Sequence, residues 1–294
     1  MISILIPVYN FGMEALVGDL LKQAKNAHVP FEIRLYDDGS EPVFKAANRK
    51  LLQLEGVIYQ EMDRNLGRSA IRNRLARDAQ FDQLLFMDCD SAVESDDFLK
   101  NYLGHLHPEK VLCGGRTYSP APPENRELLL RWQIGQAREV STASQRIPFP
   151  YRTFMTNNFV VPRSIFLTIG LNEDLEGYGH EDTLFGLELK RSGVSILHLD
   201  NPLRHIGLET CDEFLRKTRE GIRNLAFLVQ NQLVDQDVRL YRYYLRLKRW
   251  GLAGVVRWGY KQQEKKILNN LHSDSPNLKQ FDWYKLGHLL QHLR

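Results

Sequence analysis

Apolar positions in the first ninety residues recur in two alternating patterns. Short apolar runs that stop at polar turns predict strands, and they cover residues 2–8, 31–36, 56–60 and 84–87. Between them, positions with helical spacing predict helices over residues 13–27, 43–54 and 68–79. Because strand and helix alternate, the pattern predicts βαβ units, and we expect an α/β fold with a mostly parallel central sheet flanked by helices.

The pattern loses this regularity between residues 117 and 150, where five prolines interrupt the chain. A helix is predicted over residues 124–139, and we expect the whole stretch to form a mobile loop that covers a substrate. Later segments with a strand or helix pattern lie at 154–161, 181–192 and 194–199. From residue 207 the pattern is largely helical, which predicts a C-terminal helical extension.

Composition narrows the class of protein. With 294 residues, 43% of them hydrophobic and 26% charged, the chain is typical of a globular protein. A net charge of +3 is too small to indicate nucleic-acid binding, and three widely spaced cysteines favour a reducing compartment. No apolar run approaches the roughly 18 residues of a membrane span, and the N-terminus lacks a basic leader segment. We expect a cytoplasmic protein without nucleic-acid contacts, free or peripheral on the inner face of a membrane.

Polar clusters follow three of the predicted strands directly. They are Pro7-Val8-Tyr9-Asn10, Asp37-Asp38 and Asp88-Cys89-Asp90. Because ligands of open α/β sheets bind beyond the carboxyl ends of the strands, we expect these clusters to converge on one site. Two carboxylates in one turn can face a divalent cation such as Mg²⁺ or Mn²⁺, although a solvated turn or a helix N-cap explains the Asp88–Asp90 pair better when it is taken alone.

Further candidates lie downstream, and each has a structural alternative. Glu181 and Asp182 begin a helix, where acids offset the macrodipole, but a carboxylate there can also serve as a general base. His205 follows a strand and is a candidate third metal ligand, or a structural histidine. Arg68 and Arg72 share one helical face, which is either a solvated basic face or a contact for base and phosphate.

Five motifs occur in the order in which a known family carries them. They are Ile4-Leu5-Ile6-Pro7-Val8-Tyr9-Asn10, Asp37-Asp38-Gly39-Ser40, Asn65-Leu66-Gly67 with Ala70 to Asn73, Asp88-Cys89-Asp90 and Gly177-Tyr178-Gly179-His180-Glu181-Asp182. Over about residues 1–206 the chain therefore resembles the inverting glycosyltransferases of family 2. The resemblance implies a GT-A, Rossmann-like catalytic domain over 1–206, with a nucleotide-binding half at 1–92 and an acceptor half at 93–206, followed by the extension at 207–294.

The resemblance also implies roles for single residues. The donor nucleotide would be bound by Pro7, Val8, Tyr9, Asp38, Asn65, Arg68, Arg72 and Asp88, with Asp38 on the uracil and Asp88 near the ribose. The metal would be held by Asp90 and His205. Asp182 would be the base, and the sugar or acceptor would meet Glu181, Asn157, Asn158 and Gly179.

The expected activity is that of a hexosyltransferase. A sugar would pass from a nucleotide-diphosphate donor, for which the Gly-rich acidic run favours a UDP-sugar, to a hydroxyl of a glycan or lipid-linked acceptor, with Mn²⁺ or Mg²⁺ as cofactor. Such an enzyme would serve polysaccharide or cell-envelope biosynthesis. Two alternatives are a sugar-nucleotide nucleotidyltransferase, whose basic phosphate loop residues 9–13 lack, and a non-catalytic protein that binds sugar nucleotides.

The tail combines basic and aromatic residues. Residues 239–266 hold nine Lys or Arg and one acidic residue. The interleaved aromatic residues are Tyr241, Tyr243, Tyr244, Trp250, Trp258 and Tyr260. Two interpretations stay open: an interfacial segment on an anionic membrane, or helices that pack their aromatics on the catalytic domain or on a second subunit of a homodimer.

Overall fold

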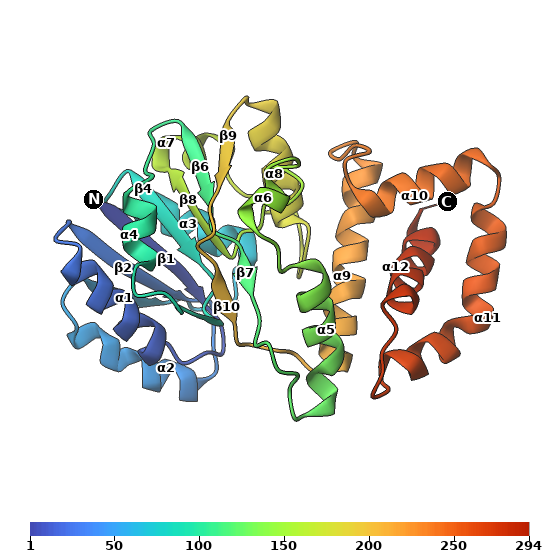
Figure 1. Ribbon diagram of the computed structural model, residues 1–294, viewed down its shortest axis with the longest axis horizontal. Coiled ribbons are helices and arrows are strands. Elements are labelled where there is room, and N and C mark those ends of the chain that lie inside the picture. Colours follow the sequence, from blue (N-terminus) through green and yellow to red (C-terminus); the bar gives the residue numbers. More distant parts are fainter. Residues whose placement is uncertain (294) are drawn as a thin grey trace. The chain divides into compact units, whose positions relative to one another are not determined.

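The computed structural model describes residues 1–293, which divide into two compact units (Figure 1). The first unit consists of Met1–Ser119, Glu139–Asp174 and Glu181–Gly207, and the second holds the remaining described residues. The second unit therefore includes two segments, 120–138 and 175–180, that lie within the predicted catalytic domain. The domain boundary expected at residue 206 stays a prediction, because a compact unit is not necessarily a folding unit.

A seven-stranded sheet forms the centre of the first unit. Its strands lie in the order β3 (Val57–Glu61), β2 (Phe31–Asp37), β1 (Ile2–Val8), β4 (Gln83–Met87), β8 (Asn158–Pro162), β6 (Lys110–Cys113) and β9 (Ser195–His198). Neighbouring strands are parallel except at β8, which is antiparallel to both β4 and β6. The predicted α/β fold with a mostly parallel sheet is confirmed.

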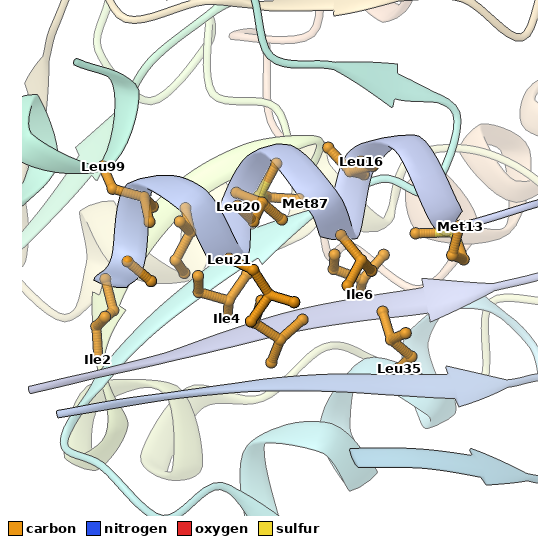
Figure 2. Close-up of a cluster of buried hydrophobic side chains, with 14 of the residues drawn as sticks. Ile2, Ile4, Ile6, Met13, Leu16, Leu20, Leu21, Leu35, Met87 and Leu99 are labelled. Atoms are coloured by element: carbon orange, nitrogen blue, oxygen red, sulfur yellow. The ribbon is translucent and has the colours of Figure 1, made fainter. Parts of the chain in front are cut away.

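Helices flank this sheet. In the first unit they are α1 (Glu14–Asn26), α2 (Pro42–Asn48), α3 (Arg68–Asp78), α4 (Phe98–Leu103), α6 (Ala143–Arg146), α7 (Arg163–Ile169) and α8 (Glu181–Arg191). Strand β1 is apolar on both faces because helices cover both. Ile4 and Ile6 pack in one core cluster together with Leu20 of α1 (Figure 2), and Leu5 packs in a second cluster with Phe86.

Element boundaries differ from the predicted ones in three places. The helix expected over 43–54 ends at Asn48 and continues as a 3-10 helix, Arg49–Gln53. The strand expected over 154–161 begins only at Asn158, because a turn before it directs the Asn157 carbonyl to the backbone N–H of Asp88, at 3.1 Å. The helix expected over 124–139 forms as a 3-10 turn, Arg126–Leu128, followed by α5 (Leu129–Arg138).

The first unit also contains a sheet of three short strands, one of which follows shortly after β4 along the chain. Its central strand β10 (Leu203–His205) is antiparallel to β5 (Ser91–Ala92) and parallel to β7 (Arg116–Thr117). The register places His205 opposite Ser91 and Leu203 opposite Arg116. Three distant parts of the chain are thereby joined next to the Asp88–Asp90 turn.

The second unit is helical, as expected for the C-terminal extension. It contains α5, α9 (Cys211–Gln230), α10 (Arg239–Arg249), α11 (Ala253–Leu271) and α12 (Leu278–His292). Helix α12 packs against α9, α10 and α11 (Figure 1). A Cβ at Gly287 would lie 2.2 Å from the buried Tyr260 ring, so only glycine permits this contact between α11 and α12. Among residues 1–293 no helix is long and apolar enough to cross a membrane.

Candidate active site

The strand ends of the first unit bring the predicted acidic clusters to one edge of the sheet. Strands β1, β2 and β4 are parallel and end at Val8, Asp37 and Met87, so the residues that follow each strand emerge on the same side. The Asp38 backbone N–H donates to the Val8 carbonyl at 2.8 Å, which ties the first two ends together. The expected convergence at the carboxyl edge is confirmed for these strands.

Asp38 fixes the loop that leads into α3. Its two carboxylate oxygens accept the backbone N–H groups of Leu66 at 2.6 Å and Gly67 at 3.1 Å. Gly39 has a φ of +80°, and a Cβ there would lie 2.8 Å from the backbone nitrogen of the exposed Asn65. Burial raises the pKa of Asp38. Since each oxygen keeps a second lone pair, the carboxylate can still accept a further donor.

Two arginines hold Asp88. The carboxylate accepts the Arg72 guanidinium at 2.5 Å on one oxygen and the Arg116 guanidinium at 3.0 Å on the other. Arg116 also pairs with Glu139 at 3.0 Å, and both arginine side chains are buried. The sequence interpretation missed Arg116 and Glu139. The signal for Arg116 was a Gly-Gly-Arg step directly after β6, where a strand ends and the backbone can approach a ligand.

Asp90 and His205 face each other across the small sheet. Asp90 Oδ1 lies 3.5 Å from Nδ1 of the buried His205, and the Asp90 carbonyl accepts the Ile206 N–H at 2.9 Å. Although burial opposes it, the His205 imidazole and the Arg116 charge hold the pKa of Asp90 below its usual range. Oδ1 of Asp90 and both ring nitrogens of His205 are buried and have no hydrogen-bond partner among the described residues.

Asp90 and His205 are better suited to bind a divalent cation than the other side chains of the Asp88–Asp90 turn. Orphaned oxygen and nitrogen atoms are the donors that a cation would satisfy, and buried polar groups normally have partners. Burial raises the pKa of the Cys89 thiol to about 12, so the thiol stays protonated and is a poor ligand. No group of three metal-ligating side chains occurs within residues 1–293, so water and donor phosphate would supply the other ligands.

Glu181 and Asp182 begin α8 with contrasting electrostatics. Burial would raise the pKa of Glu181, but the charges of Arg68 and Arg72 lower it, and Glu181 forms an ion pair with Arg68. Burial, followed by the Glu181 charge, raises the pKa of Asp182 to about 6. The Asp182 carboxylate accepts the backbone N–H of Thr183 at 2.6 Å and the hydroxyl of the same residue at 3.4 Å. The two neighbours are thus set for different tasks: a fixed charge and a carboxylate that titrates near neutrality.

Asn157 and Asn158 separate in the structure. Asn158 is fully buried, and its amide nitrogen donates to the carbonyls of Gly115 at 3.0 Å and Asn201 at 2.9 Å. Its amide oxygen accepts the Tyr102 hydroxyl at 2.7 Å. The expectation that Asn158 faces an acceptor is therefore wrong, because its side chain is satisfied inside the fold. The buried Asn157 amide has no partner on either atom in the part of the chain that the structure describes, so it can meet a ligand.

The predicted nucleobase segment is only partly accessible. The Val8 side chain is fully buried in the core, so Val8 can offer a ligand only its backbone. Tyr9 is 54% exposed, which leaves its ring free to stack on a base, and Pro7 is partly buried. Of the three residues, Tyr9 is the one whose side chain can contribute most area to a planar ligand.

Gly179 belongs to the second unit. Its φ is +96°, and a Cβ there would lie 3.0 Å from the Gly221 Cα of α9. Its carbonyl, with those of Glu176 and Tyr178, accepts the Asn224 side-chain amide. This packing explains why glycine occupies the position, and contact with a sugar stays a prediction.

Comparisons with known proteins identify the family of the chain. The family model described as "Glycosyl transferase family 2" matches residues 3–168. An uncharacterized glycosyltransferase, YfnE, of Bacillus subtilis (strain 168) is 25% identical over 240 residues, which cover 66% of this chain and 61% of that protein. The chondroitin synthase of Pasteurella multocida (strain Pm70) is 23% identical over 238 residues, 69% of this chain but only 24% of the synthase. The chain thus spans less than two thirds of either relative.

Solved structures share the fold. A mannosyltransferase from Pyrobaculum calidifontis in complex with GDP-Man and Mn²⁺ superposes with a TM-score of 0.61 at 14% identity, over 99% of this chain and 85% of that one. TarS (1–349) of S. aureus in complex with UDP-GlcNAc superposes with a TM-score of 0.52 at 15% identity, over 97% and 90%. The family model covers more than half of the chain. This chain belongs to glycosyl transferase family 2.

Proposed function

We propose that this enzyme is an inverting glycosyltransferase that moves a sugar from a nucleotide-diphosphate donor, with a UDP-sugar as the expected donor, to a hydroxyl of a glycan or lipid-linked acceptor. The observation that carries the proposal is the split between Glu181 and Asp182. A carboxylate with a pKa of about 6 is ionised at neutral pH and still basic enough to take a proton.

The proposed reaction is one in-line displacement. The acceptor oxygen attacks the anomeric carbon while the bond from that carbon to the phosphate oxygen breaks. The acceptor proton passes to Asp182, and the nucleoside diphosphate leaves with the electron pair. Because the attack comes from the face opposite the leaving group, the configuration at the anomeric carbon inverts. Glu181, held by Arg68, keeps a fixed negative charge beside the base and contacts the sugar.

The proposed donor site uses the strand ends. Tyr9 stacks on the base, Asp38 accepts the N3–H of a uracil, and Asn65 and Pro7 border the same edge. Arg72 and Arg116 fix Asp88 near the ribose. Two buried guanidinium nitrogens, Nε of Arg72 and Nε of Arg116, have no partner among residues 1–293, so polar ligand groups could satisfy them.

Asp90 and His205 are the residues we propose to hold Mn²⁺ or Mg²⁺. When bound, the cation would neutralise the charge that develops on the departing diphosphate. Support comes from the orphaned donors of these two side chains and from the Mn²⁺ in the complex of the mannosyltransferase from Pyrobaculum calidifontis. The acceptor is expected beside the Asn157 amide, whose two polar atoms are unsatisfied.

A donor screen tests the proposal. Purified protein would be incubated with UDP-, GDP- and dTDP-sugars and Mn²⁺, and the released nucleotide would be measured with and without simple glycan acceptors. We expect nucleoside diphosphate release, whereas a nucleotidyltransferase would release pyrophosphate. Replacing Asp182 with Asn should lower acceptor-dependent transfer by about 100-fold to 10,000-fold.

The matched control is Asp174→Asn, which makes the same change at an exposed position of the preceding loop. It should retain wild-type transfer. Near-normal activity of Asp182→Asn would overturn the assignment of the base, and retention of configuration in the product would overturn the inverting mechanism.

A further inference from the structure

The corner between α10 and α11 exposes an apolar cluster that the transferase chemistry does not use. Helix α10 ends at Arg249, the chain turns at Gly251 with a φ of +69°, and α11 begins at Ala253. Around this turn the exposed fractions are 68% for Trp250, 42% for Leu252, 64% for Val255 and 66% for Trp258. We call these four side chains the corner cluster.

The exposure is selective within the same stretch of sequence. Tyr244 and Tyr260, which flank the corner cluster in the sequence, are 5% and 0% exposed because they pack within the second unit. Packing against the fold thus accounts for these tyrosines and leaves both tryptophans uncovered. Exposed apolar clusters are typical of surfaces that meet a membrane, a protein partner or a ligand.

The charge around the corner has one sign. Between Val238 and Gln263 the sequence holds seven Lys or Arg and no acidic residue. Lys248, Arg249 and Lys261 are exposed, and none of them forms an ion pair with any residue between 1 and 293. A dense positive surface next to exposed tryptophan is typical of segments that lie in the headgroup region of an anionic membrane.

A cavity of about 530 Å³ adjoins the corner cluster. It is lined by the basic residues Lys248, Arg257 and Lys261 and by Ala253 and Gly254, the small residues that open α11. No acidic residue of the described chain lines it. A cavity in which three cations lie beside the apolar Leu290 and Leu293 suits a phosphate group that carries an apolar tail.

We propose that this corner is a membrane-docking site: the corner cluster inserts into the interface of an anionic bilayer, and the adjoining cavity binds the headgroup phosphate of one of its phospholipids. The site does not depend on the proposed transfer reaction, because docking needs none of the strand-end residues. It would hold the enzyme at a surface where lipid-linked or surface-bound acceptors are found.

Charge and shape favour a bilayer over the other occupants. A second copy of this chain would bring two strongly positive surfaces together, which costs free energy through like-charge repulsion. A nucleic acid would satisfy the charge and bases can stack on Trp250 and Trp258, but the aliphatic Leu252 and Val255 would stay exposed to water. Of these three occupants, only a bilayer interface takes up the charges and the four apolar side chains together.

Vesicle co-sedimentation of the full chain tests the proposal. Phosphatidylcholine vesicles would be compared with vesicles in which part of the lipid is replaced by phosphatidylglycerol. We expect binding to the anionic vesicles with a blue shift of tryptophan fluorescence. The double variant Trp250→Ser/Trp258→Ser should bind at least about tenfold more weakly. Trp283→Ser, which changes a tryptophan that is 45% exposed on α12, should bind like the wild type.

The charge contribution needs its own pair of variants. Lys248→Glu/Lys261→Glu should abolish the preference for anionic vesicles, while Lys279→Glu on α12 should keep it. A single-stranded oligonucleotide should not displace the protein from vesicles, whereas inorganic phosphate, which competes for the cavity alone, should weaken binding without abolishing it. Circular dichroism and thermal melting would verify that every variant is folded, so that lost binding reports on the surface.

Several results would overturn the proposal. These are equal binding of the double tryptophan variant, equal binding to neutral vesicles, complete displacement by phosphate, displacement by the oligonucleotide, and a dimer in sedimentation velocity that Trp250→Ser dissolves. A failure of the transferase assays would leave the docking result unchanged, because the binding measurements use no donor and no acceptor.

Discussion

Two regions of the molecule are rich in charge: the strand ends of the first unit and the α10–α11 corner of the second. They differ in whether the charges are paired within the chain. At the strand ends, Asp88 and Glu181 are held by arginines, and the carboxylate of each is largely shielded from solvent. At the corner, Lys248 and Lys261 are exposed and form no ion pair with any described residue. Internal pairing orders a site in advance, whereas exposed charge of one sign is available to a partner outside the chain. The predictions that follow test this contrast.

The largest effect is expected at the metal pair. Asp90→Asn keeps the shape of the side chain and removes its charge, so we expect transfer to fall about 1,000-fold because charge on the departing phosphate is no longer neutralised. Nucleotide release would be measured with Mn²⁺ and after chelation, which should abolish wild-type activity. The control Asp96→Asn changes an exposed acid and should stay active. Activity of Asp90→Asn within tenfold of the wild type would contradict the metal assignment.

A stability comparison of two arginines sharpens the contrast directly. Arg116→Met leaves Asp88 and Glu139 without their shared partner, and we expect a loss of about 3–5 kcal/mol in the free energy of unfolding, as for other broken buried pairs. Arg249→Met at the corner removes an exposed charge and should change it by less than about 0.5 kcal/mol. Denaturant titration would measure both. Similar losses for the two variants would mean that the corner charges are structural as well.

Two glycines with positive φ offer a smaller, matched test. Gly39→Ala places a Cβ 2.8 Å from the Asn65 backbone nitrogen, and we expect a cost of about 2–3 kcal/mol from clash and left-handed backbone together. Gly251→Ala adds a Cβ in open space and should cost only about 1 kcal/mol for the backbone alone. Melting temperatures and donor binding would be compared. Equal costs would show that the strand-end turn is less crowded than its distances indicate.

The smallest effect is a pH dependence that originates at Asp182. Its folded pKa of about 6 lies above the value of an unfolded aspartate, so the folded state binds this proton more tightly. The resulting stabilisation is complete below about pH 4 and is lost as pH rises through 6. Asp182→Asn should therefore gain about 1–2 kcal/mol relative to the wild type across this range.

The pH dependence of kcat/KM should have the opposite sign to that of stability. Below pH 6 the ratio kcat/KM of the wild type should fall tenfold for each pH unit, because the base becomes protonated. A profile of kcat/KM and of unfolding free energy between pH 4 and 8 would measure both trends, with Asp174→Asn as control. A flat stability difference between Asp182→Asn and the wild type would show that Asp182 has an ordinary pKa.

The strand ends were predictable from the sequence because an apolar run followed by acidic residues indicates both a buried strand and the residue at which it ends. Arg116 could not be identified in the same way, since its partners Asp88 and Glu139 are 28 and 23 residues away and only the small sheet brings them together. The distinction between Asn157 and Asn158 also lies beyond sequence. Alternation along a strand predicts opposite directions for neighbours, but not which direction leads to a cavity.

The tail shows the same limit. In the sequence, Tyr244, Trp250, Trp258 and Tyr260 belong to one set of aromatic residues interleaved with basic ones, which leaves both packing and membrane contact open. The structure divides the set, because Gly287 lets α12 approach Tyr260 closely while no described element covers either tryptophan. What covers a face is a tertiary property that one helix cannot reveal.

The chain passes between its two units five times, after residues 119, 138, 174, 180 and 207. As a consequence, the second unit cannot be removed by truncation or exchanged as a cassette. Cutting at residue 206 would strip α9 to α12 from α5 and leave Leu130 and Ile134, part of their shared core, facing water. Chimeras between relatives of this enzyme must therefore transplant three separate segments together, and libraries that recombine at a single crossover should yield insoluble protein.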